Sequence, residues 1–381
     1  MKRELSFSVA LLSALLVCSC NSQSTPSLEF DGKVLEAPLL SDELTDKPVY
    51  SDYVASIDTI RLESDVLESY VYWVEDLRCT DDFIFIKSRD GIYAFDYQGK
   101  FVRTIRKIGR GRGEYLEIKK FDIQERLRQI SIYDLQTASI YVYSFDGVFI
   151  KKIPVSQYIC EFTALSNGHY LLYNYEDGPQ IKGLFEIDGD GKYVKTLFEI
   201  PEYYKHIYPN QNFFNHISDD VVSFMSLEDK DIIYHYTNDS LYSAYKISTG
   251  VELPLDILQT PKTWEFPDEG YIKQLYYETD RLLSLCIWSK QNYVQLFYDK
   301  QKDHLFRMYR AEAISDGSLS DRYPYFRFVY NGRCADFISR DEIIEDPALI
   351  KRFPDYDEEC NPMIILYVPK VPNREYTGIG H

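Results

Sequence analysis

A strand–turn–strand pattern recurs along this chain and restricts the folds that it can adopt. The copies are Ile92–Ile105 (IYAFDYQGKFVRTI), Ile140–Ile153 (IYVYSFDGVFIKKI) and Leu184–Leu197 (LFEIDGDGKYVKTL). In each copy, alternating apolar residues predict a half-buried strand, a turn with glycine follows, and the second strand carries basic residues. Further strand-like pieces, such as Asp82–Lys87, lie between the copies. The pattern therefore predicts an all-β chain built from repeated sheets.

Each period of the repeat has room for about four short strands, which is typical of a β-propeller blade. One blade cannot bury both faces of its sheet, whereas blades stacked around an axis bury them all. At about 50 residues per blade, residues 49–372 predict a six-bladed β-propeller of four-stranded antiparallel blades. We expect Tyr53–Leu62 and Pro362–Val368 to share one blade, so that the two ends of the domain close the ring.

The N-terminus has the pattern of a bacterial lipoprotein signal. Lys2 and Arg3 precede the apolar run Leu5–Val17, which is too short to cross a bilayer as a permanent helix. Signal peptidase needs a small residue before its cut, so Ser19 indicates Cys20 as the lipidated residue. The alternative is an ordinary signal peptide with incidental cysteines.

The expected organisation follows from this signal. Residues 1–19 are the signal peptide, residues 20–48 form a polar, flexible tether, and residues 373–381 form a C-terminal tail. No run of acidic residues follows Cys20 directly, which favours the periplasmic side of the outer membrane. The expected location is therefore the cell envelope, with the protein held by its lipid anchor.

The charge of the chain limits its partners. A formal charge of -18 repels phosphate backbones and anionic headgroups, so we expect no nucleic-acid binding and membrane contact only through the lipid. The cysteines beyond the signal lie far apart and include no CxxC pair: Cys79, Cys160, Cys286, Cys334 and Cys360. We expect buried, unpaired thiols, and a bridge between Cys334 and Cys360 is the alternative.

One loop and the C-terminal strand resemble a known family. The segment Lys107–Tyr115 (KIGRGRGEY) follows the first hairpin, Phe121–Ile123 comes next, and Asn361-Pro362 leads into the last apolar strand. These motifs resemble the six-bladed β-propeller lipoproteins of Gram-negative bacteria, which are distantly similar to NHL-repeat propellers. The loop departs from the family pattern because it is shorter and has Arg112 where proline is usual. The resemblance implies the fold and very little about chemistry.

The same glycine-rich loop supplies the first ligand-binding candidates. It lacks the Gly-Lys-Ser/Thr end of a Walker loop and opens no helix, which argues against nucleotide binding. An irregular crossing between blades, where glycines permit positive φ, explains it without a ligand. The alternative is that Arg110 and Arg112 point into the central channel or its rim and hold an anion, with Glu114 fixing one guanidinium. Tyr115 belongs to the same candidate site.

Two further groups of residues are weaker candidates. Tyr323 and Arg327 lie in a segment that mixes aromatic and basic residues, which suits a sugar ring or a peptide but also suits packing between blades. His206 and His216 fall in a Tyr- and Asn-rich stretch, and we expect them to be solvated loop residues. No histidine pair has metal-ligand spacing.

These observations favour an envelope-anchored, non-catalytic binding module for a glycan, a peptide or a partner protein, with no cofactor. The alternative is a metal-assisted hydrolase or lyase of the NHL-propeller type, with a divalent ion such as calcium at the channel mouth. No GxSxG elbow is present, and no catalytic residue is predicted. Three or more carboxylates or amides converging in the channel would favour the enzyme.

Overall fold

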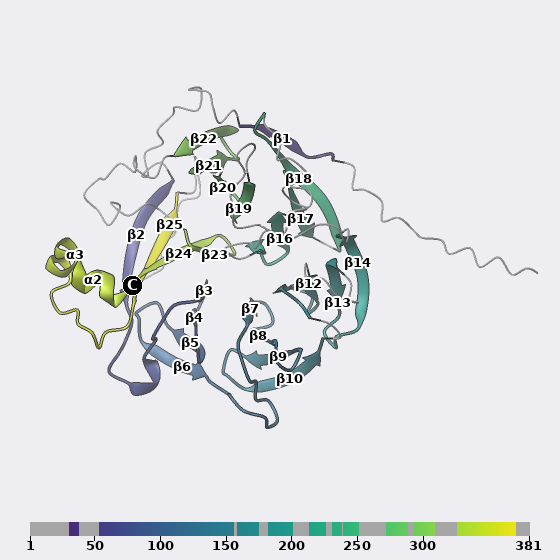
Figure 1. Ribbon diagram of the computed structural model, residues 1–381. Helices are drawn as coiled ribbons and strands as arrows, with labels where there is room; N and C mark the ends of the chain where they lie inside the picture. Colours follow the sequence, from purple (N-terminus) through teal and green to yellow (C-terminus); the bar gives the residue numbers. More distant parts are fainter. Residues whose placement is uncertain are drawn as a thin grey trace, which may run out of the picture.

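The computed structural model is an all-β propeller made of four-stranded antiparallel blades. Figure 1 shows its sheets arranged around a common centre. In each four-stranded sheet, one edge strand lies near that centre and the other lies at the circumference. The structure describes residues 30–37, 53–155, 158–174, 182–200, 213–225, 231–237, 239–250, 272–288, 293–308 and 326–370.

In the described part of the chain, four sheets are separate blades in which consecutive strands pair antiparallel. Alternation of apolar residues and glycine-containing turns produces these hairpins, as predicted from the repeat. The strands are β3 (Asp76–Cys79), β4 (Ile84–Ser88), β5 (Gly91–Phe95) and β6 (Phe101–Ile105); β7 (Lys120–Gln124), β8 (Gln129–Asp134), β9 (Ser139–Ser144) and β10 (Phe149–Pro154); β11 (Glu161–Ala164), β12 (Tyr170–Asn174), β13 (Gly183–Ile187) and β14 (Tyr193–Glu199); and β19 (Ile272–Glu278), β20 (Leu282–Trp288), β21 (Tyr293–Asp299) and β22 (His304–Met308).

The remaining described strands belong to one nine-stranded sheet, so the structure shows four separate blades where the sequence predicts six. A single parallel pair, His216 opposite Tyr330, joins the two halves of this sheet. In order across the sheet, its strands are β1 (Lys33–Glu36), β18 (Ser240–Ser248), β17 (Ile232–Thr237), β16 (Val221–Met225), β15 (Asn215–Ser218), β23 (Phe328–Tyr330), β24 (Arg333–Ile338), β25 (Met363–Pro369) and β2 (Val54–Arg61).

The first and last long strands close the ring. β2 pairs antiparallel with β25 from Val54 opposite Pro369 to Arg61 opposite Met363. The prediction that these two segments lie together and close the ring is therefore confirmed, although their sheet has nine strands and is not a separate blade. Ile364 and Ile365 of β25 are fully buried, so the closing sheet also contributes to the hydrophobic core.

The basic residues of the repeat connect neighbouring sheets. In the three copies of the repeat, the third residue of the outer strand (β6, β10 or β14) reaches the hairpin turn of the next sheet, where it meets a carboxylate or a backbone carbonyl. These contacts are Arg103 to Asp146 (2.6 Å), Lys151 to the carbonyl of Gly189, and Lys195 to the carbonyl of Asp239 (2.7 Å). The repeated pattern thus encodes both the hairpins and the links between them.

Part of the predicted tether is folded. β1 pairs in parallel with the outer strand β18, and Leu35 and Ala37 are buried there. Lys33 forms an ion pair with Asp303 in the turn of the neighbouring hairpin, much as the basic residues of the repeat do. An extended apolar segment beside an open sheet edge gains backbone hydrogen bonds and burial, which explains why these residues are ordered.

Two short helices and one 3-10 turn complete the described elements: α2 (Arg340–Glu345), α3 (Pro347–Arg352) and η3 (Leu67–Ser69). Ser339 caps α2 in a capping box with Glu342, and Asp346 caps α3. Within the described residues, none of the helices has the length and apolar character that a membrane span requires.

The cysteines of the folded domain are buried and form no disulfide bond: Cys79, Cys160, Cys286, Cys334 and Cys360. The expectation of buried thiols is confirmed, and the alternative bridge between Cys334 and Cys360 is not formed. Burial raises the pKa of the Cys79 thiol to about 12, so this group stays neutral and packs as a small apolar side chain.

Ring closure predicts that the closing sheet controls global stability. Ile364→Ala removes a fully buried side chain between β24 and β2, and we expect a loss of about 3 kcal/mol in the free energy of unfolding. Leu67→Ala, at a position 88% exposed, is the matched control and should change stability by less than about 0.5 kcal/mol. Urea unfolding followed by circular dichroism measures both, and equal effects would contradict the role of closure.

Candidate functional site

Buried charged and polar side chains link the sheets at the centre of the ring. The carboxylate of Asp122 on β7 accepts hydrogen bonds from the Thr163 hydroxyl (2.7 Å) and the Ala164 N–H (2.8 Å). His216 Nε2 lies 3.0 Å from the same carboxylate, and Arg78 Nε lies 3.6 Å from its other oxygen. These residues come from β3, β7, β11 and β15, so the cluster joins four neighbouring parts of the ring.

The cluster keeps its central carboxylate charged. Burial alone would raise the pKa of Asp122, but His216, Arg78 and the Ala164 N–H outweigh it and lower that pKa to about 2. His216 is buried here, so the expectation of a solvated loop histidine is wrong. The physical reason is that His216 lies on strand β15, where its ring contacts Asp122 of β7 and Thr163 of β11.

Little space remains beside this cluster. A cavity of about 10 Å³ lies among Arg78, Asp122, Thr163 and His216, which is room for about one water molecule. Asp122 Oδ1, Arg78 Nε and His216 Nδ1 are buried there without a hydrogen-bond partner among the described residues. This part of the centre is therefore filled by side chains and has no room for an organic ligand.

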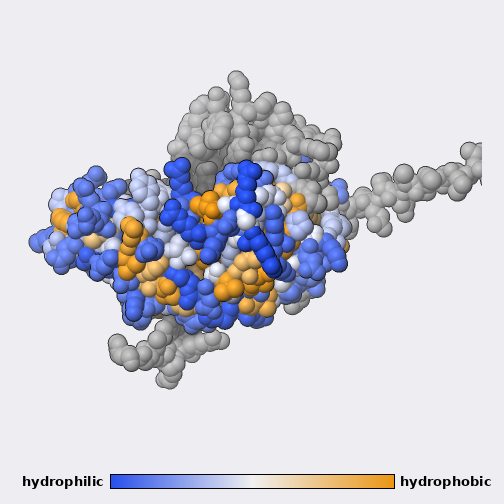
Figure 2. Space-filling model, turned by 90° about the horizontal axis from the view of Figure 1, so that it is seen from below, coloured by the Kyte–Doolittle hydropathy of each residue, from blue (hydrophilic) through white to orange (hydrophobic). Residues whose placement is uncertain are grey.

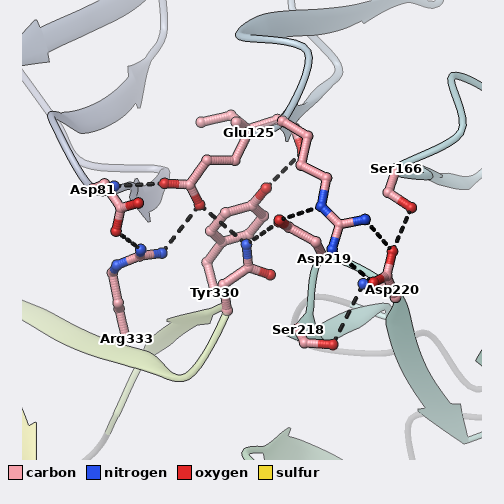
Figure 3. Close-up of polar contacts among 11 residues, drawn as sticks. Asp81, Glu125, Ser166, Ser218, Asp219, Asp220, Tyr330 and Arg333 are labelled. Carbon is pink, nitrogen blue, oxygen red and sulfur yellow. Dashed lines mark hydrogen bonds and ion pairs between the residues drawn. The ribbon is translucent and has the colours of Figure 1, made fainter.

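Figure 3 shows that turns following the innermost strands meet through polar contacts. Arg333, after β23, forms ion pairs with Glu125 (3.1 Å) and with Asp81. Asn331 donates hydrogen bonds to Glu125 (3.1 Å) and to Asp219. Each contact joins two different turns, so these polar groups hold the turns together.

A second half of the same network surrounds Arg126, and Figure 3 labels its partners Asp219 and Asp220. Its guanidinium pairs with Asp219 (3.2 Å) and binds both carboxylate oxygens of Asp220 at 2.7 Å. Ser166 also donates to Asp220 at 2.8 Å. Each of the four carboxylates in these turns is paired with Arg126 or Arg333, which suits a structural role.

The glycine-rich loop lies at the circumference, against the outer strands of the following blade. The buried Tyr115 hydroxyl donates to the Ile105 carbonyl (2.9 Å), and the Tyr143 hydroxyl of β9 donates to the Gly113 carbonyl (2.7 Å). Gly113 has a φ of +75°, and a Cβ there would collide with the Phe149 ring. The chain must pass from the outer strand β6 to the inner strand β7, so the loop first crosses the outer edge.

Arg110 and Arg112 therefore do not point into the central channel or its rim, so that alternative for the loop is wrong. Both side chains are exposed on the loop and form no ion pair with any described residue. Glu114 accepts the Gly111 N–H at 2.7 Å, so its predicted contact with a guanidinium is also absent among the described contacts. The Glu114 carboxylate thus bonds within its own loop, and the guanidinium groups of Arg110 and Arg112 remain without a partner among the described residues.

A groove of about 760 Å³ separates this loop from the outer part of the next blade. Figure 2 looks onto this edge of the ring, where hydrophilic and hydrophobic surface lie side by side. The groove combines cations from the loop with aromatic, aliphatic and basic side chains of β9 and β10. The residues that line it are Gly109, Arg110, Gly111, Arg112, Gly113, Glu114, Leu116, Gln136, Thr137, Tyr141, Phe149, Ile150, Lys151 and Lys152.

The far wall of the groove supplies a third cation that sequence reasoning missed. Lys152 is exposed, and its ammonium lies 5.0 Å from the centre of the Tyr141 ring. Lys151, by contrast, is bound to the Gly189 carbonyl. The sequence contains a signal for Lys152, because the other two copies of the repeat have Thr104 and Thr196 at this position.

The remaining candidates do not join this groove. Arg327 forms an ion pair with Asp336 (3.2 Å) and stacks over the Phe337 ring (4.6 Å), so it has a packing role. Tyr323, His206 and Cys20 lie outside the described residues. Within the described ranges, no three His, Cys, Asp or Glu side chains form a group that could hold a metal ion.

The chain belongs to the family described as Domain of unknown function (DUF4934), whose model matches residues 40–368. Among curated proteins, no sequence matches significantly. A solved structure of a "putative exported protein" from Bacteroides fragilis NCTC 9343 has 15% identity and a TM-score of 0.69, and the match covers 89% of this chain and 99% of that chain. This likeness shows the fold alone.

A second solved structure is less similar. It is a member of the DUF4221 family from Bacteroides vulgatus ATCC 8482, with 11% identity and a TM-score of 0.49 over 84% of this chain and 98% of that chain. A likeness at this level carries no argument about this chain.

The buried cluster predicts a specific dependence of stability on pH. Because the folded state lowers the pKa of Asp122 below the ordinary value of 3.8, the ionised carboxylate stabilises the fold above about pH 4. That contribution, about 2 kcal/mol, is lost as the pH falls towards 2. Asp122→Asn should therefore be destabilised at pH 7 and approach the wild type near pH 2.

Urea unfolding between pH 2 and pH 7 measures this difference. Glu358→Gln, an exposed carboxylate, is the control and should follow the wild type throughout. A constant gap between Asp122→Asn and the wild type at every pH would argue against a stabilising charge on Asp122.

Proposed function

We propose that this protein is an exported, non-catalytic binding module that holds an anionic ligand in the groove between the glycine-rich loop and β10. The observation that carries the proposal is the set of three cations in this groove, Arg110, Arg112 and Lys152, that have no carboxylate partner among the described residues. Fixed cations around a concave surface attract an anion and bind it by charge-assisted hydrogen bonds.

These three cations differ from the arginines near the centre of the ring. The formal charge of the protein is -18, so acidic side chains are plentiful. Arg78, Arg126 and Arg333 each pair with at least two carboxylates. A ligand that brings its own carboxylate, sulfate or phosphate would supply the missing partner.

The walls of the groove support a ligand with some apolar surface. Tyr141 and Phe149 are aromatic, and Ile150 is 43% exposed. Ligand sites generally combine apolar walls with a few well-placed polar groups. The proposed ligand is therefore an acidic glycan or peptide whose rings or side chains contact these walls.

The six-bladed form also belongs to this proposal. The nine-stranded sheet separates into β15–β18, with β1 added, and into β23–β25 with β2, because one residue pair alone joins the halves. Each half then has the four strands of a blade. Together with the four separate blades this makes six, as expected for an NHL-like propeller lipoprotein.

Binding to this groove can be tested with two anionic probes, hexagalacturonate and hexaglutamate, by titration calorimetry. Arg110→Glu combined with Arg112→Glu should weaken binding at least tenfold, because it replaces attraction by repulsion, and added salt should weaken binding to the wild type. Lys100→Glu with Lys192→Glu makes the same change in net charge at exposed turns outside the groove and is the control. Absence of binding to both probes, or an equal loss in the control, would refute the proposal.

Export and lipidation rest on the N-terminal pattern and on the name of the similar Bacteroides fragilis protein. We propose acylation at Cys20 and attachment to the periplasmic side of the outer membrane. The wild type should partition into the detergent phase of Triton X-114, and Cys20→Ser should move to the aqueous phase, since it cannot carry the lipid. Detergent partitioning that survives this substitution would show another means of attachment.

A further inference from the structure

The segment between β2 and β3 exposes large apolar side chains on a backbone that is firmly held. Leu67 is 88% exposed, Tyr72 is 71% exposed and Trp73 is 55% exposed. Burying a side chain of this size contributes about 2 kcal/mol or more. Because these side chains are exposed, they do not contribute that stabilisation. Their exposure therefore indicates a role in binding another molecule.

The inner side of this segment is anchored by Asn361, which is fully buried. Its amide donates to the carbonyls of Glu63 (2.6 Å) and Ser69 (2.9 Å), and its carbonyl accepts the Val71 N–H (2.7 Å). One side chain from the far end of the domain thus fixes three points of the segment. Val71 itself is buried and adds an apolar anchor.

Arg340 of α2 fixes the outer part of the same segment. Its guanidinium lies 4.6 Å from the centre of the Tyr70 ring and donates to the Tyr72 carbonyl at 2.8 Å. The backbone N–H of Trp73 donates to the Ser88 hydroxyl at 3.4 Å. The backbone that presents Tyr72 and Trp73 is therefore ordered before any ligand arrives, which reduces the entropy cost of binding.

The charges of the segment bear on the class of ligand. Arg340 lies 5.8 Å from the centre of the Tyr72 ring, but it is buried and donates to backbone carbonyls. Asp65 and Glu68 of the segment are exposed, and their carboxylates have no hydrogen-bond or ion-pair partner among the described residues. Exposed carboxylates repel phosphates and sulfates, which disfavours anionic lipid and nucleic acid. Asp and Glu are also depleted in protein–protein interfaces, so this composition does not favour a protein partner.

A neutral sugar can interact with both the exposed aromatic rings and the exposed carboxylates. The face of a pyranose ring that carries C–H bonds packs against the negative face of an aromatic ring, and the sugar hydroxyls donate to carboxylates. We propose that Trp73, together with Tyr72, is a stacking site for a neutral glycan at the segment between β2 and β3. This site is separate from the anion-binding groove and does not depend on it.

The test is an array of neutral hexasaccharides of glucose, mannose, xylose and galactose, followed by calorimetry with the best-bound member. Trp73→Ala should weaken binding at least tenfold, whereas Trp73→Phe keeps an aromatic face and should retain part of the affinity. Both variants should melt within about 2 °C of the wild type, since the indole is more than half exposed.

The Arg110→Glu, Arg112→Glu variant is the matched control, because it removes the anion site and should bind the neutral glycan normally. Binding to no member of the array, or binding that survives Trp73→Ala, would overturn the proposal. Retention of an envelope protein through Trp73, without glycan binding, would overturn it as well. Each of these results leaves the anion-binding groove to be judged by its own probes.

Discussion

The pairing of β2 with β25 is the interaction on which the rest of this structure depends. Each sheet has two apolar faces, and each face is buried only while a neighbouring sheet stands beside it. An open array would expose one face at each end, whereas a closed ring exposes none. Residues 54–61 and 363–369 make that closure through backbone hydrogen bonds between distant parts of the chain. The stability of every blade is therefore coupled to one strand pair.

Charge is distributed in this ring according to the same constraint. At the centre, Asp122 and Arg78 are buried and must be paired, because an isolated buried charge is strongly destabilising. At the outer strands, Arg103 and Lys195 reach across to the next hairpin. The charged and apolar groups that these structural contacts leave unused are the ones that remain open to a ligand.

The repeat predicted the blades and their hairpins because both follow from local alternation and turn chemistry. The pairing of β2 and β25 was also predictable, since a propeller requires closure. The contact between β15 and β23 could not be predicted, because a single parallel residue pair leaves no periodic pattern in the sequence. The folded state of Lys33–Glu36 was missed for a similar reason, since its partner β18 lies about two hundred residues away.

The position of Arg110 and Arg112 shows why a motif alone did not place the site. The loop composition was read correctly as a crossing between blades, but its direction depends on sheet order, which places β6 and β10 at the circumference. Lys152 was recognisable only by comparing the copies, where it replaces a threonine. In a repeat protein the residues that preserve the pattern maintain the ring. A residue that departs from the pattern and stays exposed is not needed to maintain the ring. Lys152 is such a residue, and it lines the same groove as Arg110 and Arg112.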